Sequence, residues 1–150
     1  MDVIPELEAE FQASKRIEEV QVFRGKGGLK TVVEDVLRVN KTWYVLGGAR
    51  NLSKALEYYF PHWSKRREEQ GLKIKIIRDS SMRKSGEQAK NIEVRYLKSE
   101  FKFPANVGIY GDNVVEFLFG EEPLIIIIRS EMAAKGFMEY FNLLWKMSKE

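Results

Sequence analysis

Apolar residues follow two spacings along this chain, and the changes between them predict its secondary structure. Alternating or short continuous apolar runs predict seven strands, at residues 19–24, 42–46, 72–77, 92–97, 107–110, 114–119 and 124–128. Apolar residues spaced three and four apart predict helices at 5–14, 29–37, 52–70 and 131–148. Helices alternate with strands in the first half, and several strands precede a closing helix. The pattern predicts an α/β fold with a mixed β-sheet flanked by helices.

Several residues set the expected boundaries. Pro61 must kink or split the long second helix, because proline lacks an amide donor and clashes with the preceding turn. Gly71 is typical of a helix C-terminus. Gly111-Asp112-Asn113 predicts a tight turn between two strands. The run 124–128 is apolar on both faces, which predicts a strand buried between helix layers. Residues 79–90 are expected to form a polar loop with one helical turn at most.

The chain is expected to hold a linker and one domain. Ile4, Leu7 and Phe11 form a narrow apolar stripe, which suits a connecting or pairing helix better than a core helix. We therefore assign residues 1–17 to an N-terminal linker or dimerisation helix and residues 18–150 to a single domain. No separate helix-turn-helix domain fits ahead of Val20.

Composition excludes several chemistries. The 150 residues include no cysteine and one histidine, His62, so thiolate zinc sites, a cysteine nucleophile and a histidine metal site are not expected. We predict no catalytic residues, no metal and no cofactor. No apolar run approaches the ~20 residues that span a bilayer, and the N-terminus has no signal-peptide pattern. A cytoplasmic protein without membrane contact is expected.

Charge is unevenly distributed. The net charge is +3, but residues 65–102 carry 12 Lys and Arg against 6 Asp and Glu. This stretch could favour an anionic ligand or DNA phosphates, or it could be an ordinary solvated surface. Within it, Lys65-Arg66-Arg67 lies near a helix C-terminus, where positive charge complements the helix dipole and needs no ligand. The aromatic side chains of Trp43, Trp63 and Trp145 fall on core-type positions, and we interpret them as packing residues.

Polar groups at the ends of predicted strands form the candidate site. Residues 24–28, 47–51 and 78–81 each follow a strand, and ligands of open α/β sheets bind beyond the carboxyl ends of strands. If these strands are parallel, the three segments converge on one rim. Ordinary polar loops are the alternative, and the glycines at 25–28 could simply make a tight turn with positive φ. The candidate ligand-binding residues are Arg24, Arg50, Asn51, Arg78, Asp79 and Asn106.

Five segments together resemble the C-terminal effector domain of TrmB-type transcriptional regulators, common in archaea. They are Ile4-Pro5-Glu6-Leu7, residues 20–29, the aromatic helix 60–71 with Trp63, Arg66 and Arg67, the strand Val94-Arg95-Tyr96-Leu97, and residues 140–145. Their order and spacing cover the chain from Ile4 to Trp145. The resemblance implies one half of a phospholipase D-like fold that senses a small ligand, a sugar in known members, and helps the protein dimerise. It also implies that DNA is bound only by an N-terminal winged-helix domain, which this chain lacks.

The resemblance also permits a test for catalysis. Phospholipase D chemistry uses the pattern His-x-Lys-x-x-x-x-Asp, with the histidine as nucleophile and the lysine stabilising phosphate charge. If Asp112 fills the aspartate position, Ala105 replaces the histidine and Val107 replaces the lysine. His62 has the wrong spacing and lies on a predicted helix.

We therefore expect a non-catalytic domain that senses a small polar ligand, either a sugar or an anion, and self-associates. Three alternatives stay open from the sequence: an oligomerisation scaffold without a ligand, a phospholipase D-like phosphodiesterase or nuclease, and direct DNA binding by the basic stretch.

Overall fold

The computed structural model describes residues 18–47, 50–83, 89–98, 100 and 106–150, so the expected helix at 5–14 lies outside the described residues. The seven strands are β1 (Glu19–Arg24), β2 (Trp43–Leu46), β3 (Ile74–Asp79), β4 (Ile92–Leu97), β5 (Asn106–Tyr110), β6 (Asn113–Phe119) and β7 (Pro123–Arg129). The helices are α2 (Gly25–Val39), α3 (Arg50–Ala55), α4 (Phe60–Gln70) and α5 (Glu131–Met147), with a single 3₁₀ turn at Ser80–Met82. The predicted α/β class is confirmed.

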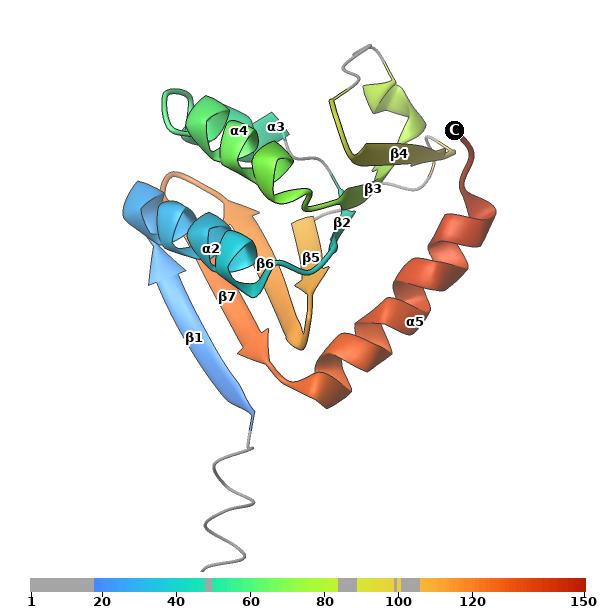
Figure 1. The fold of residues 1–150 in the computed structure, drawn as a ribbon. Coiled ribbons are helices and arrows are strands. Elements are labelled where there is room, and N and C mark those ends of the chain that lie inside the picture. The colour runs from blue at the N-terminus through green and yellow to red at the C-terminus, as the bar shows by residue number, and fades with distance from the viewer. Residues whose placement is uncertain (1–17, 48–49, 84–88, 99, 101–105) are drawn as a thin grey trace, which may run out of the picture.

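All seven strands form one mixed sheet in the order β1-β7-β6-β5-β2-β3-β4. Strands β2, β3 and β4 are parallel, and every other neighbouring pair is antiparallel. Strands β1, β6, β2, β3 and β4 therefore all end at one edge of the sheet, where β5 and β7 begin (Figure 1). This shared edge is called the upper edge below.

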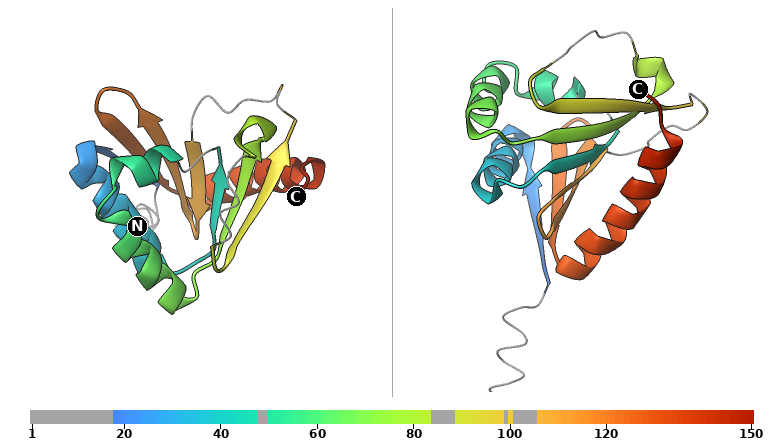
Figure 2. Two further views of the ribbon diagram at one scale, coloured as in Figure 1. Left: turned by 90° about the horizontal axis from the view of Figure 1, so that it is seen from above. Right: turned by 45° about the vertical axis from the view of Figure 1, so that its right-hand side comes forward.

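The sheet lies between two helical layers (Figure 2). Helices α2, α3 and α4 cover one face, where the larger core includes Leu29, Val32, Trp43 and Trp63. Helix α5 crosses the other face, and its residues Ala134 and Phe141 pack on a smaller core. In the inner strands the side chains alternate between the two cores, because successive residues of a strand point to opposite faces. On β1, at one side of the sheet, Val20 and Val22 are instead exposed.

The proline splits the second helix as expected. Helix α3 ends at Ala55, and α4 begins at Phe60 with Pro61 in its first turn. At the other end Gly71 has φ of 72°, and its amide donates to the carbonyls of Arg67 and Glu68. The indole of Trp63 is fully buried and donates to the Val33 carbonyl of α2 at 2.7 Å, which joins the two helices.

Strand β7 differs from the prediction. Ile125 and Ile127 are buried beneath α2, but Ile126 and Ile128 on the other face are only half-buried. Helix α5 packs mainly over β5 and β6 and covers β7 incompletely. The isoleucines of β7 are therefore covered fully on the α2 face and only in part on the α5 face. The sequence of one strand does not show how far a helix distant in the chain extends over it.

Strand β3 begins and ends two residues later than predicted. The strand includes Arg78 and Asp79, which the sequence placed at its end. Arg78 consequently shares a face with Ile74 and Ile76, the face that looks toward α4, because alternate residues share a face. This register turns Arg78 from a residue expected just after the strand into a buried residue within it.

A polar cluster joins α2 to the sheet at the lower edge. The Asp35 side chain is 10% exposed and accepts hydrogen bonds from Arg38, Arg129 and Tyr110. Burial alone would raise the pKa of Asp35, but these three donors favour the carboxylate and hold the pKa below its usual value.

Because the folded-state pKa is lowered, the carboxylate stabilises the fold fully above the unfolded pKa of about 3.9. This stabilisation is lost as the pH falls through the lower folded-state pKa. We expect Asp35→Asn to cost about 1–2 kcal/mol at neutral pH and to flatten the fall in stability below pH ~4. Urea denaturation across the acid range measures both effects. If the free energy of unfolding fell equally steeply with decreasing pH in the variant and in the unmodified protein, this role of Asp35 would be contradicted.

Candidate functional site

The register of the sheet brings several predicted site residues to the upper edge. Leu46, the last residue of β2, pairs with Ile77 on one side and with Val107 on the other. The adjacent Arg78 and Asn106 therefore flank the end of β2. Two of the six candidate residues therefore lie near each other at the upper edge, Arg78 at the end of β3 and Asn106 at the start of β5, and their role in binding stays a prediction.

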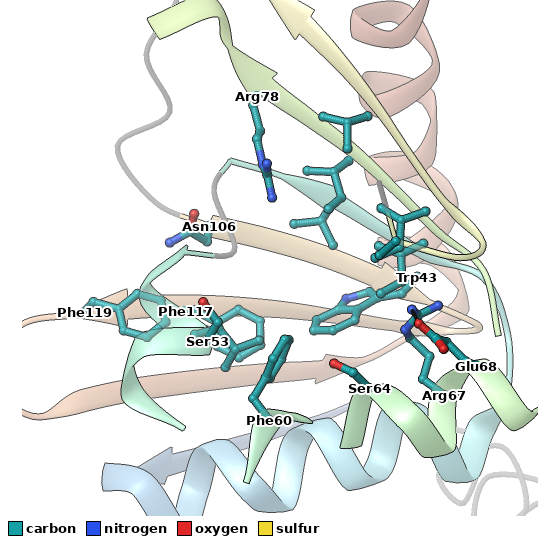
Figure 3. Close-up of a pocket in the computed structure, with 17 residues that line it drawn as sticks. Trp43, Ser53, Phe60, Ser64, Arg67, Glu68, Arg78, Asn106, Phe117 and Phe119 are labelled. Carbon is teal, nitrogen blue, oxygen red and sulfur yellow. Dashed lines mark ion pairs between the residues drawn. The ribbon is translucent and has the colours of Figure 1, made fainter. Parts of the chain in front are cut away.

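A cavity of about 220 Å³ opens beside them, between the sheet and helices α3 and α4 (Figure 3). Its walls are mostly apolar. Strands contribute Trp43, Val45, Ile74, Ile76, Ile92, Val94, Phe117 and Phe119, while Leu52 and Phe60 come from the helices. The polar side chains at the cavity are Ser53, Ser64, Arg67, Glu68, Arg78 and Asn106. A largely apolar pocket with a few polar groups is the usual form of a small-molecule site.

Arg78 lies at the end of the cavity near the upper edge of the sheet (Figure 3). It is 9% exposed, and its side chain points from β3 into the cavity (Figure 3). Its buried Nε has no hydrogen-bond partner. Among the described residues no carboxylate lies within 4 Å of its guanidinium nitrogens. A buried cation without a partner is costly, so this arrangement indicates a place for a ligand.

Arg67 occupies the other end of the cavity and corrects the interpretation of the Lys65-Arg66-Arg67 run. Its side chain is 1% exposed, and one terminal nitrogen donates to the carbonyls of Leu72 and Lys90, each at 3.0 Å. Its other terminal nitrogen lies 3.6 Å from a Glu68 carboxylate oxygen. Burial lowers the pKa of this guanidinium, and the Glu68 charge partly opposes that shift. Arg67 therefore links α4 to the residues that precede β3 and β4. It is a buried structural residue rather than a surface charge that only complements the helix dipole.

The remaining candidates do not line the cavity through any described side chain. Arg24 is exposed at the end of β1, and four strands separate β1 from β3. Five strand spacings of about 4.8 Å put roughly 24 Å between those strands. The Asp79 carboxylate caps the 3₁₀ turn by accepting from the Ser81 amide and hydroxyl. Arg50 and Asn51 begin α3 beside the upper edge, and their side chains lie outside the described structure.

Two of the three positions tested for phospholipase D chemistry, Val107 and Asp112, lie on the β5–β6 hairpin. Val107 is on β5 and packs on the α5 side of the sheet, and Asp112 is in the tight turn. Ala105 lies outside the described residues. His62 is exposed on α4. Within the described ranges no group of three or more histidines and carboxylates could hold a metal ion, and none of the helices described is long and apolar enough to cross a membrane.

Sequence reasoning missed the aromatic walls and Arg67. Trp43 was interpreted as packing alone, although it is both a core residue and a wall of the cavity. One signal for this was available. Gly108 lies two residues after Asn106 and therefore on the same face of the strand. A glycine inside a strand often marks the close approach of another group. Here that group is the Trp43 indole.

The order of strands and the two helical layers define a phospholipase D-like domain. No protein-family model matches the sequence, and no curated protein does either. Solved structures do match. TrmBL2, an archaeal chromatin protein described with a novel mode of DNA binding, aligns over 98% of this chain with a TM-score of 0.57 and 20% identity. The chain spans 65% of the length of TrmBL2.

Two further solved structures have the same fold, and one of them is a phospholipase D family member. NucT from Helicobacter pylori aligns over 89% of this chain and 99% of its own, with a TM-score of 0.58 and 11% identity. Nuc from Salmonella typhimurium aligns over 89% and 97%, with a TM-score of 0.55 and 18% identity. The fold that the TrmB resemblance implied is therefore confirmed, and identities this low show the fold alone.

Proposed function

We propose that this chain is a non-catalytic effector domain that binds a small ligand in the cavity between the sheet and α4. The observation that carries the proposal is Arg78, which is buried, has no hydrogen-bond or ion-pair partner among the described residues, and points into an apolar cavity at the upper edge. Of the six predicted binding residues, Arg78 and Asn106 have side chains at this cavity. Arg50, Asn51 and Asp79 stay candidates for the surrounding rim, whereas Arg24, on β1 and separated from β3 by four strands, does not reach it.

The absence of catalysis is part of the proposal. Covalent phosphodiester cleavage in this fold would need an imidazole and an ammonium group together near the start of β5. Val107 supplies an isopropyl group there, and His62, the single histidine of the chain, lies on the surface of α4. Turnover of a phosphodiester such as bis(4-nitrophenyl) phosphate by the purified protein would contradict this part.

We further propose a role in transcription regulation, supported by the shared fold of TrmBL2, which binds DNA. In this proposal a winged-helix domain outside the chain contacts DNA, and the ligand changes how two protomers are arranged. Such coupling requires that the two arrangements bind the ligand with different affinity. Self-association and a cytoplasmic location stay predictions from the sequence.

A scaffold without a ligand is the second candidate, and one observation favours it. Helix α5 carries a stripe of apolar side chains at helical spacing, each more than half exposed: Met132, Tyr140, Leu143 and Met147. Exposed apolar stripes of this kind are typical of helix pairing. The two proposed functions differ in one testable respect: an effector domain binds a ligand in the cavity, and a scaffold does not.

Filling the cavity tests the proposed function. Ser64 lines the cavity from α4, and His62 is exposed on the same helix. We expect small molecules from a thermal-shift panel of sugars, nucleotides and organic acids to stabilise the protein and its His62→Trp variant equally. The Ser64→Trp variant should lose that stabilisation, because the indole takes the space of the ligand. A panel in which no compound stabilises the unmodified protein would favour the scaffold.

A further inference from the structure

The charges around the cavity do not balance. Three charged side chains line it, namely Arg67, Glu68 and Arg78. Glu68 lies beside Arg67, which also has two carbonyl partners. Arg78 is left with neither an ion pair nor a hydrogen bond to any described residue, although it is nine-tenths buried. As far as the described residues go, the cavity therefore has one uncompensated positive charge, that of Arg78, at the end near the upper edge.

A guanidinium is suited to one kind of ligand group. Its planar fork of N–H donors matches the two oxygens of a carboxylate or the oxygens of a phosphate. Such a charge-assisted bond is strongest in a site with little water, because few solvent dipoles screen it. An anion seated beside Arg78 would satisfy the buried Nε and compensate the charge at once.

The rest of the cavity is suited to an apolar body. Aromatic rings of Trp43, Phe60, Phe117 and Phe119 face it. A dry cavity of about 150 Å³ binds benzene, so the observed volume of about 220 Å³ has room for one substituted ring with an acidic group. A free sugar suits these walls less well, because each of its hydroxyls would need a polar partner once buried.

We infer that the ligand of this cavity is a small organic anion, a single apolar ring bearing a carboxylate or phosphate that pairs with Arg78. This inference rests on the proposed function, since it names the class of ligand for the same cavity. It differs from the sugar that the TrmB resemblance implied. Both parts of the ligand are needed for recognition. The aromatic walls alone would also accept a neutral ring, and Arg78 alone would also accept an inorganic anion.

Isothermal titration with matched probes tests the inference. Benzoate and phenyl phosphate share the ring and carry the two candidate anions, benzamide is the neutral counterpart of benzoate, and inorganic phosphate lacks the ring. We expect the better of the two ring anions to bind about 10- to 100-fold more tightly than benzamide, the range of one charge-assisted hydrogen bond. Inorganic phosphate should bind more weakly than either ring anion.

Variants of Arg78 test whether this side chain causes the preference for a ring anion over benzamide. Arg78→Met should bring the affinity for the ring anion down to that for benzamide, and Arg78→Lys should retain part of the preference, because it keeps the charge without the fork. Arg24→Met, exposed on β1, is the matched control and should bind as the unmodified protein does. Arg78→Met should also raise the melting temperature of the unliganded protein, because it removes an unpartnered buried charge.

The outcomes separate the two proposals. Equal affinity for benzoate, phenyl phosphate and benzamide, blocked by Ser64→Trp, would overturn the inference and leave the proposed function standing. Binding of a sugar in the same cavity, unaffected by Arg78→Met, would do the same. A marked loss of stability in unliganded Arg78→Met would also overturn it, since Arg78 would then serve the fold rather than a ligand. No stabilisation by any compound, in this set or in the wider panel, would overturn both.

Discussion

Replacing Arg67 by methionine is expected to lower the free energy of unfolding by about 3 kcal/mol, the loss typical of removing a buried charged partner. Two carbonyls would lose their donor, that of Leu72 in a buried hydrogen bond and that of Lys90 in a partly buried one. Methionine fills much of the same volume, so the loss would come mainly from the hydrogen bonds. Equilibrium denaturation in urea measures the change.

The neighbouring arginine provides the control. Arg66 is about half exposed and forms an ion pair with Glu34 on the surface of α2. Exposed ion pairs contribute at most about 1 kcal/mol, so Arg66→Met should be several-fold less costly than Arg67→Met. Similar losses for the two variants would contradict the role assigned to Arg67. The pair therefore tests whether burial rather than charge decides the contribution of each arginine.

Replacing Gly108 by alanine is expected to cost about 3 kcal/mol, at the upper end of what overpacking usually costs. A Cβ at this position would lie 2.3 Å from Nε1 of Trp43 and 3.1 Å from a Val115 methyl carbon. The indole has little room to withdraw, because it is 3% exposed and packs against the rings of Trp63 and Phe117. Thermal and urea denaturation measure the loss.

The same substitution in α5 is the matched control. A Cβ at Gly136 would meet nothing within 4 Å. Alanine in a helix is more favourable than glycine by up to ~1 kcal/mol, so Gly136→Ala should stabilise the protein. Opposite signs for the two Gly→Ala changes are expected. A neutral Gly108→Ala variant would show that Trp43 can move, and would weaken its assignment as a fixed wall of the cavity.

The fold was largely accessible from the sequence because its signals are local. Each of the seven strands was predicted from its own run of apolar residues, and Pro61 and Gly71 marked helix boundaries through their backbone chemistry. The error in β3 was small in length but large in effect. A shift of two residues placed Arg78 inside the strand, on the face that looks toward α4.

The candidate site could be predicted only in part from the sequence. Strand ends predicted Arg78 and Asn106, because the direction of each strand decides which end reaches the upper edge. The same reasoning also selected Arg24, since strand direction says nothing about order across the sheet. The intervening strands β7, β6, β5 and β2 keep Arg24 away from the cavity.

The sequence by itself determined the order and approximate bounds of the described strands and helices, the α/β class, and the lack of a histidine at position 105 and a lysine at position 107. These depend on the period of apolar positions and on which side chains are present. Only the tertiary structure decided that Arg67 is buried, that the Trp43 indole needs a glycine at position 108, and that Arg78 enters a cavity with no partner among the described residues. The physical reason is that burial, close approach and missing partners are properties of residues distant in the chain, and they arise only when the layers pack together.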